Sequence, residues 1–300
     1  MTDILERTEV LAPAPGLALA GLLGVQAPDL AADEPLPIPW HWVYLLERPA
    51  QADLGPDGHP ARGGIPVPPG PGRRRMWASG TVTGLGPLRC GRPATRRTQV
   101  LGSQDKEGRS GPMTFVTVGH EIVQDGAVVV REEQHIVYLD AAPPVGGAAG
   151  AASGGSSGMP QAPAVTPDPS VPSVPSVPAV PIGPAEWDVV VDPTLLFRYS
   201  ALTYNAHRIH YDRDFARDVE GYPGLVVHGP LQATLMAEAA RRRGLVEPGR
   251  PVQLAYRMQS PLFDHQGLVV SAVPGPDGVA TSVRDRWGRV TATGTLRLPS

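Results

Sequence analysis

The sequence predicts an α+β fold in two halves, each with an antiparallel sheet that wraps a helix. Three features support it: short runs rich in Val and Thr with alternating polar residues, one strongly apolar helical segment, and a Gly-, Ser- and Pro-rich stretch in mid-chain. A period of two is typical of half-buried strands, whereas an apolar face repeating every three to four residues is typical of a helix. The 300 residues are enough for two domains of ordinary size.

Strands are expected on both sides of the central stretch. They fall at 76–83, 95–101, 113–123, 127–139, 187–192, 251–258, 268–273, 279–285 and 290–298. Turns that contain glycine separate several of them, because glycine readily adopts the positive φ of tight connections. These turns are expected at 105–108, 124–126, 274–278 and 285–288.

The clearest helix is expected to begin at Pro230, since the first turn of a helix needs no amide hydrogen there. Its apolar face carries Leu231, Leu235, Met236 and Ala239. Arginines at 241–243 complement the negative helix end, and Gly244 can end the helix. One apolar helix within antiparallel strands describes the hot-dog fold. The first half has similar strands and a weaker helix signal, so a double hot-dog is predicted.

The central stretch, 141–184, is predicted to be a linker. Glycine and serine make 146–158 flexible, whereas regularly spaced proline holds 169–181 near polyproline II. The expected domains are therefore 1–140 and 185–300.

Composition narrows the function classes. With 26 basic and 29 acidic residues, the net charge of −3 gives no reason to expect a nucleic-acid partner. Cys90 is the single cysteine, the chain start lacks signal-peptide features, and no apolar run reaches the roughly 20 residues needed to cross a bilayer. A soluble cytoplasmic protein that acts on a small molecule, without a membrane partner, is expected.

Chemically useful side chains are densest in 197–230, which contains three histidines. This segment resembles the MaoC-type hydratases, and most closely the branch of type 2 hydroxyacyl-thioester dehydratases and mesaconyl-C4-CoA and itaconyl-CoA hydratases. The wider family carries Asp-x-Asn-Pro-x-His on a loop over the hot-dog helix, followed by His-Gly at the helix start. The match places Asn205 on the family's aspartate, His210 on its histidine, and His228 with Gly229 on the His-Gly pair.

The resemblance extends through the first half, at 39–44, 54–60, 74–77, 108–112 and 120–121. It implies that the second half carries the catalytic loop, while the first has lost the motif and its helix shapes an acyl pocket. It also implies an acyl-CoA or acyl-carrier thioester as substrate, a place in fatty acid metabolism, and no metal or redox cofactor. A homodimer is possible.

Hydration of an α,β-unsaturated thioester needs a base for water, an acid for the α-carbon and a donor to the enolate-like oxygen. His210 can serve as base and acid in turn, and the Gly229 N–H at the helix start can serve as the donor. Asn205 cannot exchange a proton near neutral pH, so it can only orient the water or the carbonyl. The alternative is that Tyr204, His207 or Asp212 is recruited.

The predicted substrate contacts are Tyr204, His207, Arg208, Tyr222, Pro223 and His228. Each has a structural alternative: Arg208 could pair with Asp212 or Asp214, the His228 ring could bond the loop, and Tyr222 with Pro223 could form a rigid turn. Trp40, Trp42 and Trp77 are expected in the core of the first half. His59, beside Asp57, is expected to be a loop histidine and not a metal ligand.

Two other functions remain open. Hot-dog proteins also hydrolyse thioesters, which would need a carboxylate or activated water at the carbonyl, and Asn205 does not supply it. The alternative outside enzymes is a subunit that binds acyl thioesters but has lost its catalytic pair. Asn205, in the place of the family's aspartate, is the residue that suggests it.

Overall fold

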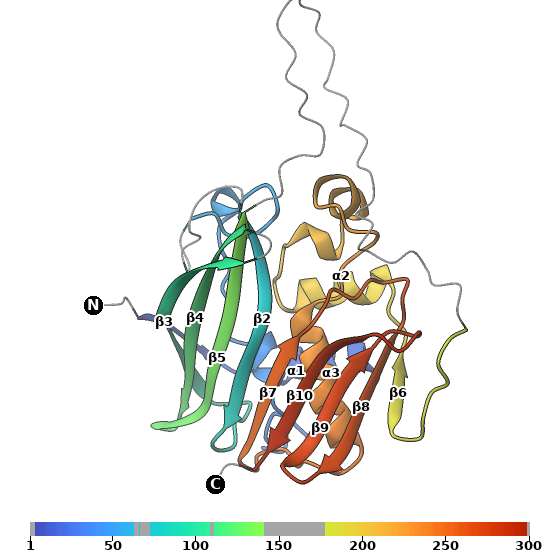
Figure 1. Cartoon of the computed structure of the whole chain (residues 1–300). Helices are drawn as coiled ribbons and strands as arrows, with labels where there is room; N and C mark the ends of the chain where they lie inside the picture. The colour runs from blue at the N-terminus through green and yellow to red at the C-terminus, as the bar shows by residue number, and fades with distance from the viewer. Residues whose placement is uncertain (1–3, 63–65, 67–72, 109–110, 141–177, 299–300) are drawn as a thin grey trace, which may run out of the picture.

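The computed structural model describes residues 4–62, 66, 73–108, 111–140 and 178–298 (Figure 1). Most of the predicted linker, including 146–158 and the proline repeat as far as residue 177, lies outside the described residues. Its last residues lie against the second half: the Val180 N–H donates to the Arg286 carbonyl at 2.7 Å.

The described strands form one ten-stranded antiparallel sheet in the order β1-β3-β4-β5-β2-β7-β10-β9-β8-β6. Their bounds are β1 Leu5–Val10, β2 Arg73–Gly84, β3 Pro93–Gly108, β4 Gly111–Gln124, β5 Ala127–Asp140, β6 Glu186–Val189, β7 Val252–Met258, β8 Leu268–Gly275, β9 Gly278–Arg284 and β10 Val290–Arg297. Every predicted strand is present. The two predicted sheets are joined edge to edge, because β2 pairs with β5 on one side and β7 on the other.

The turns follow the prediction with one correction. Asp125 and Gly126 both have positive φ, 51° and 79°, as a two-residue hairpin turn between β4 and β5 requires. The segment 105–108 is not a turn: β3 continues through it and pairs as far as Gly108 with Gly111. The polar residues of this segment are compatible with a strand whose side chains are exposed, which a turn prediction based on composition cannot distinguish.

The described α-helices are α1 Pro13–Leu23, α2 Pro193–Leu202 and α3 Gly229–Arg242 (Figure 1); α3 lies on the sheet, whereas α1 packs on α2. The predicted helix is α3, which starts one residue early and packs on β8, β9 and β10. Gly244 follows it with a φ of 67°. The sequence did not predict α2, although Asp192 caps it by accepting from the Leu195 N–H at 2.7 Å. Within the described residues, none of the helices is long and apolar enough to cross a membrane.

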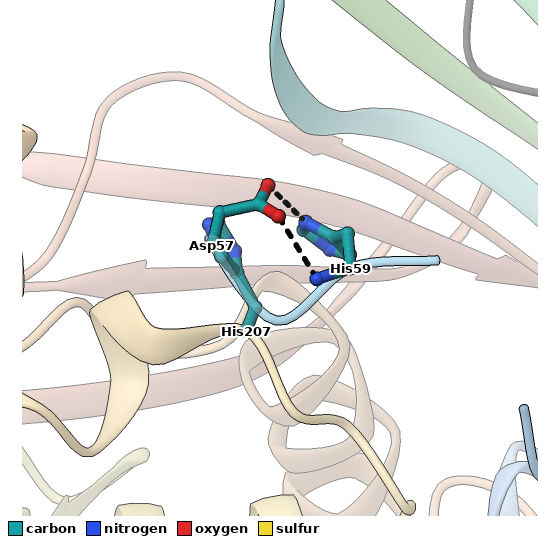
Figure 2. A group of neighbouring side chains, drawn as sticks. All are labelled: Asp57, His59 and His207. Atoms are coloured by element: carbon teal, nitrogen blue, oxygen red, sulfur yellow. Dashed lines mark hydrogen bonds and ion pairs between the residues drawn. The ribbon is translucent and has the colours of Figure 1, made fainter. Parts of the chain in front are cut away.

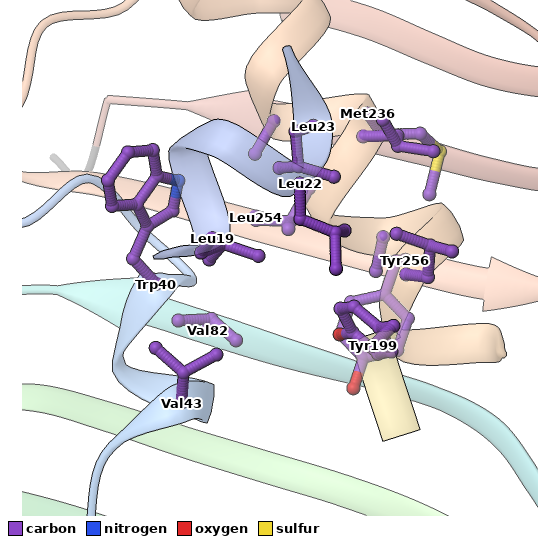
Figure 3. Packing of buried hydrophobic residues seen from close by; sticks show 14 of the residues in the cluster. Leu19, Leu22, Leu23, Trp40, Val43, Val82, Tyr199, Met236, Leu254 and Tyr256 are labelled. Atoms are coloured by element: carbon purple, nitrogen blue, oxygen red, sulfur yellow. The ribbon is translucent and has the colours of Figure 1, made fainter. Parts of the chain in front are cut away.

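The two halves share one apolar core. Figure 3 shows leucines of α1 packed with Val82 of β2, Tyr199 of α2 and Met236 of α3. A buried polar contact also joins the halves: Trp40 Nε1 donates to Glu238 Oε1 at 2.8 Å, and Arg241 pairs with the same carboxylate. We therefore expect neither half to be stable alone, because each would expose the core surface that the other covers.

Candidate active site

A cavity of about 1190 Å³ lies between the halves. Strands β2, β4 and β5 and the segment 41–61 supply its first wall, and the segment 197–211 with the start of α3 supplies the second. No described residue of α1 lines it, so the expectation that the first-half helix shapes the pocket is wrong. This helix is short and apolar, and it packs on α2 and on the 3₁₀ turn Trp40–Val43.

His210 lies on this cavity at the end of the 3₁₀ turn Arg208–His210. Its Nδ1 must donate to the Val226 carbonyl oxygen at 2.7 Å, because a carbonyl can only accept. The proton on Nδ1 leaves the Nε2 lone pair free to take a proton. Burial lowers the pKa of His210 to about 4, so the ring is neutral at neutral pH.

A second histidine, His228, stacks on the ring of His210. The rings of His210 and His228 stack with their centroids 3.7 Å apart and their planes inclined by 19°. His228 is fully buried, and its Nε2 is 2.8 Å from Ser200 Oγ of α2. Burial holds the pKa of His228 well below its usual value. Two neutral stacked rings therefore fix the orientation of His210.

Asn205 also lines the cavity, with its side chain held in place. Its Oδ1 accepts from the His207 N–H at 3.0 Å, and its own N–H donates to the Ser200 carbonyl at 2.8 Å. Its Nδ2 has no acceptor among the described residues. Asn205 is thus placed to donate a hydrogen bond to a water or carbonyl oxygen in the cavity.

Gly229 begins α3 at the wall of the cavity. Its backbone N–H has no acceptor in the described part of the chain, and it lies at the positive end of a 14-residue helix. A Cβ here would lie 3.2 Å from Trp77 Cδ1 and 3.4 Å from Met258 Cγ. Glycine therefore leaves room for a ligand oxygen to approach the N–H.

The comparisons with known proteins agree with this geometry. The family model for hydroxyacyl-thioester dehydratase type 2 matches residues 39–264. Mesaconyl-C(4)-CoA hydratase of Chloroflexus aurantiacus is 41% identical over 284 residues, which cover 94% of this chain and 91% of that protein. The chain belongs to the type 2 hydroxyacyl-thioester dehydratase family. It is accordingly a hydro-lyase that acts on acyl thioesters.

Further similarities support the fold. The mitochondrial type 2 hydroxyacyl-thioester dehydratase of Schizosaccharomyces pombe is 39% identical over 82 residues, 27% of each chain. A MaoC-like dehydratase from Phytophthora capsici superposes with a TM-score of 0.63 at 16% identity, covering 100% of this chain and 96% of that one. A Mycobacterium tuberculosis protein described as having a double hotdog fold superposes with a TM-score of 0.50 at 18% identity, covering 99% and 96%. The double hot-dog prediction is confirmed.

This family member brings a loop of the first half onto the catalytic segment (Figure 2). The His59 Nδ1–H donates to Asp57 Oδ2 at 3.2 Å, and the His59 ring lies 4.0 Å from the His207 ring, centroid to centroid. The His207 ring is in turn 5.4 Å from that of His210. Burial is the main cause that lowers the pKa of both His59 and His207. The sequence alone predicts only a loop histidine at His59, because Asp57 and His207 are far apart in the chain.

The same three side chains, Asp57, His59 and His207, could offer metal-ligand atoms that lie within 4.8 Å of one another. Two features argue against a cation. The Asp57 carboxylate already accepts from both the N–H and the Nδ1–H of His59. The positive charge of Arg75 also lies close enough to lower the pKa of both histidines, so it would repel a cation at the same place. The positive charge of Arg75 therefore disfavours a cation at this cluster.

Close packing of the two loops makes Gly58 a sensitive position. It has a φ of 87°, and a Cβ would overlap the Ala206 carbonyl oxygen. We expect Gly58→Ala to lower the melting temperature by several degrees and to reduce turnover, because positive φ and the overlap together cost more than about 1 kcal/mol. Thermal unfolding and an enoyl-CoA assay check this. Gly91→Ala is a matched control: its φ is 78° with open space around the Cβ. Equal effects of both substitutions would show that the loop contact is unimportant.

Three predicted substrate contacts lie outside the cavity: Arg208, Pro223 and His228. Arg208 pairs with Asp212 at 2.7 Å and its guanidinium lies 4.2 Å from the Phe215 ring centroid, as its structural alternative proposed. Pro223 does not line the cavity, and His228 is completely buried. Tyr204, His207 and Tyr222 do line the cavity. For Arg208, the structure contains the ion pair with the carboxylate four residues along, a spacing that brings side chains together on a helical turn.

Tryptophans of the first half are also placed differently from expectation. Trp40 is fully buried in the core as predicted, whereas Trp42 and Trp77 line the cavity. Trp42 Nε1 donates to Glu132 Oε1 at 2.9 Å, and His41 Nε2 lies 3.0 Å from Glu132 Oε2. The first wall of the cavity therefore contains a polar, hydrogen-bonded group of side chains.

Proposed function

We propose that this enzyme reversibly adds water to a short α,β-unsaturated acyl-CoA that carries a second carboxylate, of the mesaconyl type. The observation that carries the proposal is that His210 and Gly229 line the same cavity. The His210 Nδ1 donates to the Val226 carbonyl, and its Nε2 has no partner among the described residues. The similarity to mesaconyl-C(4)-CoA hydratase supports the choice of acyl group.

The mechanism assigns one proton carrier. His210 Nε2 takes a proton from water as the water oxygen bonds to the β-carbon, and the π electrons move through the α-carbon onto the thioester oxygen. The Gly229 N–H stabilises this enolate oxygen. The His210 imidazolium then gives its proton to the α-carbon, which restores the carbonyl and the neutral ring. Asn205 holds the water by donating from Nδ2.

A short polar acyl group suits the cavity better than a fatty acyl chain. The wall includes the half-buried Arg75, which has no hydrogen-bond or ion-pair partner among the described residues and whose charge a long alkyl chain would desolvate without offering a hydrogen bond. We further propose that the acyl group is carried by CoA and not by an acyl carrier protein, and that the enzyme acts in the cytoplasm. Fatty acid metabolism is the less favoured pathway on this argument.

One assay separates this function from the alternatives. Purified protein is incubated with crotonyl-CoA and with mesaconyl-C4-CoA, while enoyl absorbance and free thiol are followed together. Hydration removes the enoyl absorbance and releases no thiol. Thiol release would instead show a thioesterase, and binding without either change would show a binding subunit.

Substitution of Asn205 by aspartate restores the carboxylate of the wider family. In the Asn205→Asp variant a carboxylate oxygen can still accept from the His207 N–H, so we expect the loop to persist and hydration to be retained or raised. The added negative charge would also raise the pKa of His210 and shift the pH-rate profile upward. Asn205→Ala, which removes both the acceptor and the donor, is the control and should be impaired. A profile of kcat against pH for the three proteins checks this; an Asn205→Asp variant as impaired as Asn205→Ala would contradict it.

A further inference from the structure

We propose that Arg75 binds the free carboxylate of the acyl group and thereby selects dicarboxylyl over simple enoyl substrates. This inference rests on the proposed hydration and adds to it the residue that sets acyl specificity.

Arg75 differs from the other arginines on the cavity. It lies on β2 directly after two arginines that are both engaged. Arg73 bonds Thr114 Oγ1 at 2.9 Å, Arg74 bonds Glu220 at 2.7 Å, and Arg96 bonds Glu47 at 3.1 Å. The half-buried Arg75 has no hydrogen-bond or ion-pair partner among the described residues. A guanidinium that is partly removed from water gains most from an anionic ligand with two acceptor oxygens.

The position of Arg75 favours the acyl carboxylate over the phosphates of CoA. Arg75 lines the same cavity as His59, His207 and His210, and its charge lowers the pKa of His59 and His207, so it lies beside the row of rings that leads to His210. In a mesaconyl-C4 thioester the free carboxylate is attached to the β-carbon, the atom to which water adds, so it must lie close to His210. The CoA phosphates lie a pantetheine arm away from that carbon.

The carboxylate of the neighbouring loop is already engaged by other hydrogen bonds. Asp57 is held by two bonds from His59, so the described residues leave the positive charge of Arg75 uncompensated. A substrate carboxylate would compensate it and would be oriented by the planar guanidinium, with the β-carbon directed toward His210.

The test compares two acyl groups on two thioester handles. Wild type and Arg75→Met are assayed for kcat/KM with crotonyl and mesaconyl-C4 thioesters, each of CoA and of N-acetylcysteamine. We expect Arg75→Met to lose about 10- to 100-fold on mesaconyl-C4 with both handles, as for a charged hydrogen bond, and to change little on crotonyl. Arg74→Met, which removes a cation already paired with Glu220, is the matched control and should affect both acyl groups by the same factor.

Three results would overturn the proposal. A loss with both CoA thioesters and neither N-acetylcysteamine thioester would show that Arg75 binds CoA phosphate. An equal loss on all four substrates would show a structural role. If wild type hydrates none of them, the proposed function fails, and binding of succinyl-CoA and butyryl-CoA then decides the inference. Arg75→Met should weaken only the binding of succinyl-CoA. An unchanged ratio of the two dissociation constants would refute the inference.

Discussion

His210→Ala is expected to lower kcat for enoyl-CoA hydration by about 10²- to 10⁴-fold, the usual contribution of a general acid/base group. The same ring takes the proton from water and returns it to the α-carbon, so its removal abolishes both steps. Affinity for a saturated acyl-CoA should stay nearly unchanged, since the thioester oxygen still meets the Gly229 N–H. Steady-state kinetics with crotonyl-CoA and calorimetric titration with butyryl-CoA measure the two quantities. His265→Ala, a partly exposed histidine that does not line the cavity, is the control.

Retention of wild-type turnover by His210→Ala would move the acid/base role elsewhere. Asp212 is paired with Arg208, and Tyr204 is half exposed at the cavity edge. The Asp57–His59 pair would then be the strongest remaining candidate, because the carboxylate fixes the tautomer and supports a protonated ring.

Acid is expected to destabilise the protein steeply between pH 6.5 and about 5. Among the described histidines, those with lowered pKa values are His59, His120, His207, His210 and His228, and burial is the main cause for each. Below pH 6.5 the unfolded chain binds protons at these positions while the folded chain does not, so the free energy of unfolding falls as pH falls. The loss continues to about pH 4 for His120 and His210, whose pKa values are lowered to about 4. Each histidine contributes up to about 1.4 kcal/mol per pH unit.

Urea unfolding at pH 7, 6 and 5 measures this slope. Carboxylates with lowered pKa, such as Glu132 at about 2, lose their contribution only at lower pH, so this window isolates the histidines. His120→Gln, in the first half of the chain, should reduce the slope by at most about 1.4 kcal/mol per pH unit. A free energy of unfolding that is constant or rises from pH 7 to 5 would contradict the assignment of neutral buried rings.

The fold was predictable where periodicity is strong. The predicted strands and α3 carry clear two- and four-residue patterns, and all of them are present. By contrast, α1 is apolar around much of its surface and rich in glycine and proline, so it has no face to detect. The joining of two sheets through β2 and β7 depends on pairing between residues about 170 positions apart, as between Gly84 and Val252, and no local pattern encodes it.

The candidate site divides in the same way. Asn205, His210 and Gly229 belong to one motif within a short stretch of chain, and the structure places all three on one cavity. Arg75 and the Asp57–His59 pair reach that cavity from the other half of the chain, which sequence spacing cannot reveal. The sequence alone cannot distinguish ligand binding by Arg208 from an ion pair with Asp212, which is the contact that the structure contains.

The most direct test of the proposed chemistry is a crystal structure of the protein with a saturated, unreactive thioester such as methylsuccinyl-CoA. We predict that the thioester oxygen accepts from the Gly229 N–H and that the β-carbon faces His210 Nε2, with space for one water that Asn205 Nδ2 can bind. An acyl group bound away from α3, or a His210 Nε2 turned from the β-carbon, would contradict this prediction.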